Sequence, residues 1–467
     1  MSHLIAIAFF ALLILGLFAL QRDRKVRTSK ALWIPTIWVM IFMSRGVSLW
    51  FGAASEIPSS AELLSGNPLD RAIISGLLAV GLIVLLCRAR RVIPILSMNW
   101  PILLFFSYCF ISVFWSDYPG VAFKRWVRAI GDIVMILVVL SDREWLTAIK
   151  RLLTRMGFVL IPLSVMLIEF FPAIGRAYSP EDGYMTYTGV TLNKNTLGML
   201  CLIVGIASVW RLVALYRNSY HQTRQFIAHG LILALVVWLL IVANSMTSLL
   251  CLLIASGFIV TVRLPGRQKS LQLHFITGAI ACGALLVFLL PDAVALVTHA
   301  VGRNATLTGR TELWSALVKM KTNPWFGTGF ASFWLGNRLD EIWSLFSWYP
   351  NEAHNGYLGI YLNLGWVGIT LLGVLLLTGY RNVVAAFRRH PEVGSLMLGF
   401  YVTAIFYNLA EEAFRHNDAI WIFFLMAIVN IPALYSSRHI PTREPLEEGI
   451  FEEELEDPTT ALHEGVV

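Results

Sequence analysis

Long apolar runs, separated by short polar segments, dominate the chain up to residue 435. Thirteen such runs lie near residues 4–20, 31–51, 71–87, 93–115, 124–140, 152–171, 191–210, 227–243, 248–262, 274–290, 355–378, 394–411 and 418–435. A membrane-spanning helix needs ~20 apolar residues, which is close to the length of most of these runs. The pattern therefore predicts an all-α polytopic integral membrane protein with about 12–13 transmembrane helices.

Two segments do not follow this pattern. Residues 291–353 form one large polar loop, within which 308–322 has a capping Thr308 and apolar residues at helical spacing. This spacing predicts an amphipathic helix lying on the bilayer. The tail, 436–467, contains the acidic run EEGIFEEELED, which is typical of a disordered, solvated segment. We therefore expect ten spans in 1–290, the loop, three spans in 354–435, and the tail.

Composition excludes a soluble enzyme. The chain is 57% hydrophobic and 14% charged, with a mean hydropathy of +0.68, whereas soluble proteins carry about 25% charged residues. No GxxxxGK[ST] loop, GxGxxG turn or HExxH pair is found in the sequence, which argues against an ATP-driven pump or a nicotinamide enzyme. The five cysteines all lie in apolar runs without a CxxC pair, which predicts small buried hydrophobic residues.

The distribution of positive charge predicts the topology. Alternate loops hold 21 lysines and arginines, whereas the short loops between them hold only Arg176 and Arg415. By the positive-inside rule the amino terminus faces outward and the tail lies in the cytoplasm. In a Gram-negative cell this predicts the inner membrane, with the large loop in the periplasm. The net charge of +7 follows this topology and does not indicate nucleic-acid binding.

Some cations lie on the outer side, where the charge rule predicts few. They are Arg45, Lys124, Arg125, Arg128, Arg176, Lys194, Arg303 and Arg310. Intramembrane charge usually marks a function or a partner, and guanidinium groups bind phosphate with paired hydrogen bonds. The set therefore indicates a pyrophosphate site. Structural alternatives remain for each: Arg128 could pair with Asp132, Arg45 could reach the interface, and Lys124 could bind lipid headgroups.

A second candidate site is NEAHNGYLGIYLNLGWVG, 351–368, where the large loop meets the eleventh run. The 4,3,4,3 spacing of His354, Leu358, Tyr361, Gly365 and Gly368 predicts that they share one helical face. The two glycines would let another helix approach closely. A neutral His354 at the outer end of that face could accept a proton from a sugar hydroxyl, with Glu352 or a main-chain carbonyl fixing its tautomer.

These residues carry a resemblance to a known family. His354-Asn355, nine residues, Gly365, two residues and Gly368 match the H-[NSQ]-x9-G-x-x-[GTY] motif of bacterial O-antigen ligases and Wzy-type polysaccharide polymerases. Further stretches resemble the exopolysaccharide-production (ExoQ-type) branch of the same superfamily: SRGVSLW at 44–50, NPLDR at 67–71, WSDYP at 115–119, YTGVTLNKNTLG at 187–198 and TLTGRTELW at 306–314.

The resemblance implies a GT-C-like glycosyltransferase without metal or cofactor, acting at the outer face of the inner membrane. Its donor would be a glycan on undecaprenyl pyrophosphate, and its acceptor a sugar hydroxyl. Carried over, His354 is the catalytic base and Arg310 the leading phosphate ligand. Lys194 stands where some relatives have arginine, and Arg176, Arg303, Arg128, Arg45 and Asn355 are further candidate substrate-binding residues, with Gly365 and Gly368 as the structural motif.

Three other functions remain open. A ligase would transfer the lipid-linked polysaccharide to lipid A-core, whereas a polymerase would transfer it to another lipid-linked repeat; the ExoQ-like stretches favour the polymerase. A transporter or flippase would be expected to show an internal repeat, and we find none. An inactive partner in an assembly complex would not need His354 and Arg310. Chain-length regulators and export proteins are the protein partners expected of a polymerase.

Overall fold

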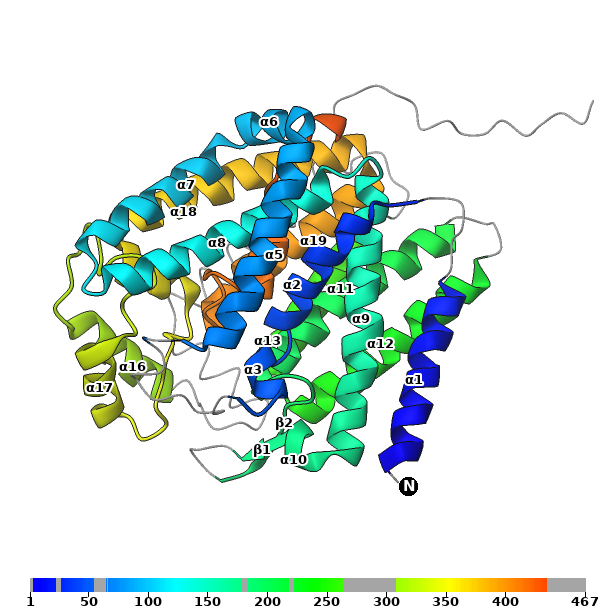
Figure 1. Ribbon diagram of the computed structural model, residues 1–467, viewed down its shortest axis with the longest axis horizontal. Helices are drawn as coiled ribbons and strands as arrows, with labels where there is room; N and C mark the ends of the chain where they lie inside the picture. The colour runs from blue at the N-terminus through cyan, green and yellow to red at the C-terminus, as the bar shows by residue number, and fades with distance from the viewer. Residues whose placement is uncertain are drawn as a thin grey trace, which may run out of the picture.

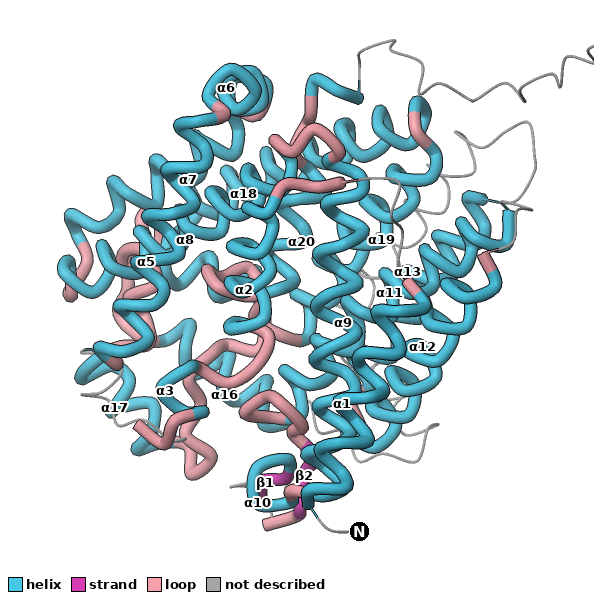
Figure 2. The backbone as a smooth tube through the Cα atoms, turned by 45° about the vertical axis from the view of Figure 1, so that its right-hand side comes forward, coloured by secondary structure: helices cyan, strands magenta, loops and turns pink. Residues whose placement is uncertain are grey.

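The structure is a computed structural model that describes residues 3–21, 27–53, 64, 66–178, 183–217, 222–263 and 308–434. Nearly all of this is helix, as Figure 2 shows, and one two-stranded antiparallel sheet pairs Arg176 with Tyr187. The elements are α1 (His3–Leu20), η1 (Lys30–Leu32), α2 (Trp33–Phe42), α3 (Val47–Trp50), α5 (Pro68–Cys87), α6 (Ala89–Met98), α7 (Trp100–Ile111), η2 (Ser112–Trp115), α8 (Pro119–Leu140), α9 (Trp145–Phe170), α10 (Pro172–Gly175), β1 (Arg176–Tyr178), β2 (Met185–Tyr187), α11 (Lys194–Arg217), α12 (Thr223–Ala243), α13 (Met246–Arg263), α16 (Thr308–Lys319), α17 (Gly336–Leu345), α18 (Gly356–Arg389), α19 (Pro391–Ala410), α20 (Ala419–Ile428) and η3 (Pro432–Leu434).

The all-α polytopic fold is confirmed. Within the described residues, seven helices are long and apolar enough to cross a membrane, or eight if the bent pair α6–α7 counts as one. Three shorter apolar helices, 30–42, 246–262 and 419–428, add to these. Twelve of the thirteen predicted runs fall on described helices, and the run at 274–290 lies outside the described residues.

The core lies around α19 and α20. All ten residues of α20 are buried, which explains why this short helix is apolar on every side. α19 packs against α11, α13, α18 and α20. By contrast, α1 and α5 leave many large apolar side chains exposed, such as Leu4 and Leu86, at 78% and 76%. Such surfaces are expected where a helix faces lipid.

Several of the lysine- and arginine-rich loops that the charge pattern predicts on the cytoplasmic side meet at one end of the molecule, here called the basic end. There Ser29 donates to Asp142 at 3.1 Å and Lys150 pairs with Glu392 at 2.7 Å. All four residues belong to the predicted basic loops or their borders. At the opposite end, Arg338 pairs with Asp117 at 2.8 Å. In Figure 1 α6 lies at the top, while α3, α10, α16, α17 and the strands lie along the lower side.

Three predicted runs are broken, for local reasons. The second run stops at Phe42, and Arg45 lies in the break before α3. The fourth bends by 85° at Asn99, because α6 is a separate amphipathic helix. The eleventh breaks at Gly365, whose φ of 66° and ψ of −164° are not helical. Apolar composition alone does not reveal these breaks.

Two further expectations are corrected. The helix predicted at 308–322 is α16, but Leu313 and Leu317 pack in a second protein core with Phe333, Leu339 and Leu362 rather than on the bilayer. Among the cysteines, Cys109, Cys201 and Cys251 are buried as predicted, whereas Cys87 is exposed at the end of α5. Cys282 lies outside the described residues.

Candidate active site

His354 lies in the loop before α18 and not on the predicted helical face. Its backbone is left-handed, with φ of 49°, a conformation that is costly for a residue with a side chain and is concentrated at functional sites. The next residue, Asn355, caps α18: its Oδ1 accepts the N–H groups of Tyr357 and Leu358, both at 3.0 Å. The cap fixes where the helix begins and thereby where the His354 side chain leaves the chain.

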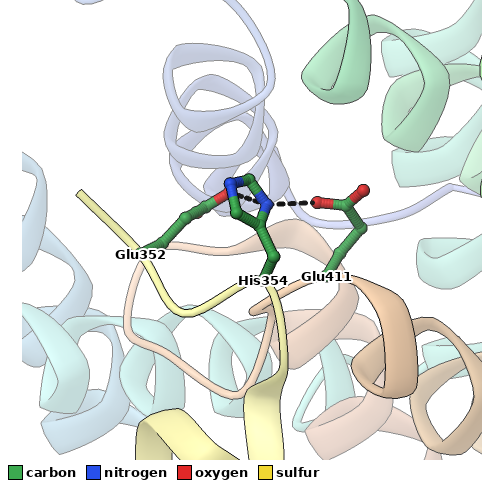
Figure 3. A group of neighbouring side chains, drawn as sticks. All are labelled: Glu352, His354 and Glu411. Carbon is green, nitrogen blue, oxygen red and sulfur yellow. Dashed lines mark hydrogen bonds and ion pairs between the residues drawn. The ribbon is translucent and has the colours of Figure 1, made fainter. Parts of the chain in front are cut away.

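Two carboxylates hold the His354 ring. Its Nδ1 lies 3.1 Å from Glu411 Oε2 and 3.2 Å from Glu352 Oε1, as Figure 3 shows. Ionised carboxylates can only accept hydrogen bonds, so Nδ1 carries the hydrogen and Nε2 of the neutral ring is the acceptor. Trp348 lies against the ring, with centroids 5.7 Å apart. The arrangement presents Nε2 as a base.

Arg310 binds the same carboxylate that holds His354. Its Nη2 is 3.0 Å from Glu411 Oε1, and its Nη1 donates to the carbonyl of Ala410. Asn195, in the first turn of α11, donates to both Glu411 oxygens at 3.4 Å. Glu411 thus joins α16, α11 and His354, and the Arg310 side chain remains 25% exposed.

A second ion-pair network lies beside the first. Arg415 Nη1 is 2.6 Å from Glu352 Oε2, and its Nε is 3.8 Å from Asp418. Glu412 accepts the N–H of Ala353 at 2.6 Å. Glu412 and Asp418 are buried and Glu352 is 15% exposed, while the Arg415 side chain is 45% exposed. Positive charge therefore remains accessible at the rim of a buried acidic cluster.

These neighbours shift the ionisation of the site. Burial alone would lower the pKa of His354, but its hydrogen bond to Glu411 and the charges of Glu352 and Glu411 outweigh burial and raise it. Burial would raise the pKa of Glu411, yet its hydrogen bond to His354 and the charge of Arg310 lower it. Burial raises the pKa of Glu412 and of Asp418 to about 7, against the opposing charge of Arg415.

The loop 411–418 is anchored from α8. The fully buried Asp132 accepts the N–H of Asn417 at 2.8 Å and the indole N–H of Trp38 at 2.9 Å. Gly131 makes room for this, because a Cβ there would clash with the Trp38 ring. The alternative that Asp132 neutralises Arg128 is therefore wrong, since among the described residues Asp132 receives hydrogen bonds from Asn417 and Trp38 and no ion pair joins it to Arg128.

The motif glycines act differently from the prediction. At the break in α18, Trp366 and Val367 donate to the carbonyls of Pro324 and Trp325 at 2.9 and 3.2 Å. A Cβ on Gly365 would clash with the Trp325 backbone, and one on Gly368 would clash with Leu364 Cβ. The close approach is thus made by the 324–329 segment of the large loop and by the helix's own Leu364, not by another helix.

The other predicted site residues are spread over the end of the molecule that lies opposite the basic end. Arg45 is 7% exposed and donates to the carbonyl of Ile174, and Arg176 donates to that of Ile168 at 2.9 Å, so both secure the backbone. Asn355 is buried as a helix cap, and its assignment to substrate binding stays a prediction. Lys194 is exposed beside Asn195, and Arg128 is half-buried. Arg303 lies outside the described residues.

Within the described part of the chain, Glu352, His354 and Glu411 are also the group that could hold a metal ion. One ligand atom from each lies within 4.8 Å of the others, and carboxylate with imidazole is a common donor set. Each carboxylate, however, already pairs with an arginine, Arg415 or Arg310. The observed hydrogen bonds account for all three groups, and metal independence stays a prediction.

Sequence reasoning missed the contribution of the 411–418 loop. Arg415 entered it only as one of two cations in the short loops, while Glu411 and Asp418 fell at the ends of the runs 394–411 and 418–435 and received no role. A signal was present, because EEAFRHND places several charges directly between two apolar runs. Asn195 was likewise overlooked beside Lys194.

The fold and this site define a multi-pass membrane protein with a partly buried histidine–carboxylate–arginine centre where its helices meet a large loop. Residues 231–373, which include the motif, match the model of the O-antigen ligase family. Over 279 residues, 58% of this chain, the sequence is 24% identical to the exopolysaccharide production protein ExoQ of Rhizobium meliloti (strain 1021). The match covers 62% of that protein's length. The predicted resemblance to this superfamily and its ExoQ-type branch is confirmed.

Proposed function

We propose that this protein is a glycosyltransferase that polymerises lipid-pyrophosphate-linked oligosaccharides into exopolysaccharide or O-antigen. The observation that carries the proposal is the His354 ring, held at Nδ1 by two carboxylates with Nε2 as acceptor. The similarity to the O-antigen ligase family and to an exopolysaccharide production protein supports the substrate class. These two similarities support a membrane protein that ligates or polymerises polysaccharide. The lipid-pyrophosphate donor is part of our proposal.

In the proposed reaction, His354 Nε2 accepts the proton of an acceptor sugar hydroxyl. The hydroxyl oxygen forms a bond to the anomeric carbon of the donor glycan, and the bond from that carbon to the phosphate oxygen breaks. The lipid pyrophosphate leaves with the electron pair. Glu411 and Glu352 stabilise the imidazolium that forms, which is the role of a base-orienting carboxylate.

The leaving group needs positive charge. Arg310 and Arg415 keep exposed edges while each holds a carboxylate of the histidine centre, and Lys194 is exposed next to Asn195. Guanidinium groups positioned in advance stabilise developing phosphate charge without having to reorganise during the reaction. The pyrophosphate of the donor is proposed to lie against these cations, with Arg128, half-buried on α8, as a further candidate ligand.

The proposed setting is the inner membrane, with the site facing the periplasm and the basic end facing the cytoplasm. The positive-inside bias of the loops supports this orientation. Undecaprenyl-pyrophosphate-linked glycans are the proposed donors, and chain-length and export proteins the proposed partners. A transporter is disfavoured, because the backbone groups freed at Gly365 are bonded to the protein's own loop rather than lining an ion site.

The test compares surface and lipid-linked glycans from a deletion strain, the wild type and a His354→Ala complement. The polymerase proposal expects single repeat units to accumulate on the lipid, with high-mass polymer lost. Accumulation of long lipid-linked polymer, with none on lipid A-core, would instead make the protein a ligase, the alternative favoured by the family description. Normal polymer in both mutant strains would overturn both functions.

A further inference from the structure

A wide groove lies at the basic end, remote from the histidine centre. Its volume is about 760 Å³, and it is bounded by the first turn of α6, the α8–α9 turn and residues 27–29. Its charged lining consists of Arg27, Arg88, Arg90, Arg91, Arg143 and Asp142. We call this the basic groove.

The groove holds an excess of positive charge. Arg88 and Arg91 are secured by the carbonyls of Val138 and Ser141, at 3.0 and 3.2 Å. Asp142, the one acidic side chain among the described residues of the lining, accepts the N–H of Ser29 and is 3.8 Å from Arg88.

The remaining arginines of the lining, Arg27, Arg90 and Arg143, are exposed, and no carboxylate of the described chain lies within ion-pair distance of them. The groove therefore presents exposed guanidinium groups to an anionic occupant.

An acidic segment of the same chain begins within reach. The described chain ends at Leu434, and Asn430 is tied to the far end of α6 by reciprocal hydrogen bonds with Asn99, both at 2.8 Å. In Figure 1 the last described residues, coloured red, lie beside α6. α6 has ten residues, so the groove at its other end is about 15 Å away.

Residues 435–446 could span roughly 40 Å when extended. Next come residues 447–457, EEGIFEEELED, of which seven are acidic and none is basic.

We propose that the basic groove is the docking site of the acidic segment 447–457. Carboxylates of this segment pair with Arg90, Arg143 and Arg27, and Phe451 packs near Leu86 and Cys87, which also line the groove. Pairing between exposed charges is screened by salt, so the contact is expected to be salt-sensitive. This docking is independent of the proposed glycosyl transfer.

Native Cys87 supplies a probe, because it is exposed in the groove while Cys109, Cys201 and Cys251 are buried. The full chain, with Cys282→Ser and Phe451→Cys, is treated in detergent with a short bis-maleimide. The cross-link between Cys87 and the thiol introduced by Phe451→Cys is quantified by peptide mass spectrometry. We expect an efficient cross-link that falls at least five-fold at high salt. A cross-link no stronger than that of a Cys87→Ser control would overturn the proposal.

Charge reversal separates this occupant from lipid. Arg90→Glu with Arg143→Glu should lower the cross-link at least five-fold, and adding Glu452→Lys, Glu453→Lys and Glu454→Lys should restore it, which misfolding would not. The salt titration tests the unaltered groove if the reversed variant is unstable. If the arginine variant instead loses co-purified anionic phospholipid while neutralising the segment changes neither lipid content nor cross-linking, the groove binds lipid and the proposal is wrong.

Discussion

The two ends of the molecule use arginine in opposite ways. At the histidine centre, Arg310 and Arg415 each hold a nearly buried carboxylate at 3.0 and 2.6 Å, and those carboxylates hold His354. In the basic groove, Arg90 and Arg143 are exposed, and Asp142 is the one acidic group that the described part of the chain supplies. The first arrangement is closed and shaped in advance, whereas the second is open and adaptable.

This difference separates chemistry from attraction. Buried, paired charges interact strongly and keep one geometry, which a proton transfer requires. Exposed charges contribute little to stability and recognise an anion mainly by its charge. Substitutions at the histidine centre should therefore change turnover, while those in the groove should leave turnover unchanged.

The largest effect is expected for His354→Ala. Removing a general base typically costs about 10²–10⁴-fold in rate, so polymer formation from purified lipid-linked repeats should fall by that factor. Membrane abundance should stay normal, and Arg90→Ala in the groove is the matched control with normal turnover. An abundant His354→Ala protein that makes full-length polymer would show that the site assignment is wrong.

Arg310→Ala should have the second-largest effect, a fall of roughly 10²-fold in the rate of polymer formation. The substitution removes a charge that stabilises the leaving group, and it leaves Glu411 without its arginine. Arg310→Lys should recover part of the rate, since lysine supplies charge without the paired geometry. Arg338→Ala is the control, because Arg338 lies in the same large loop as Arg310 and pairs with Asp117 outside the histidine centre. Equal losses for Arg338→Ala and Arg310→Ala would point to loop folding and against a specific role.

Glu411→Gln tests the coupling inside the histidine centre. Glu411 raises the pKa of His354, so removing its charge should lower that pKa. Because the unprotonated ring is the active form, the rising acid limb of the pH–rate profile should shift to lower pH while the maximal rate falls. A profile that keeps its position would mean that Glu411 does not act through His354.

Asp132→Asn should cost about tenfold in kcat with little change in KM, since an amide can accept only one of the two hydrogen bonds that Asp132 receives and the loop carrying Glu411 loosens. Trp38→Phe removes only the indole hydrogen bond to Asp132 and keeps the hydrogen bond between Asp132 and Asn417. This variant should retain more activity at equal abundance. If Trp38→Phe instead loses more activity than Asp132→Asn, Asp132 acts as a packing residue between α2 and α8.

We expect chelation of divalent metal ions to have no effect on activity. Incubation with EDTA should leave polymerisation by the purified protein unchanged, because Arg310 and Arg415 already supply positive charge to the carboxylates. Loss of activity on chelation, restored by a divalent cation, would assign Glu352, His354 and Glu411 to a metal site.

The fold was largely predictable because its main determinant is local. A run such as 394–411 is predominantly apolar, and in lipid only a helix satisfies every backbone group of such a run. The breaks within the predicted helices were harder to predict from the sequence. Gly365 reads as one glycine among many, yet its positive φ depends on the backbone of Pro324 and Trp325, which lies about forty residues earlier in the chain.

By itself the sequence determined the class of fold, the sorting of basic loops to one end, the motif around His354 and the choice of Arg310 as a candidate phosphate ligand, because hydropathy, charge and short motifs are properties of single segments. Only the tertiary structure decided that Glu411 holds His354, that Asp132 binds Asn417 rather than Arg128, and that Asn355 caps a helix. These contacts join residues from different helices and loops. A hydrogen bond depends on distances of a few tenths of an ångström, which spacing along one segment does not specify.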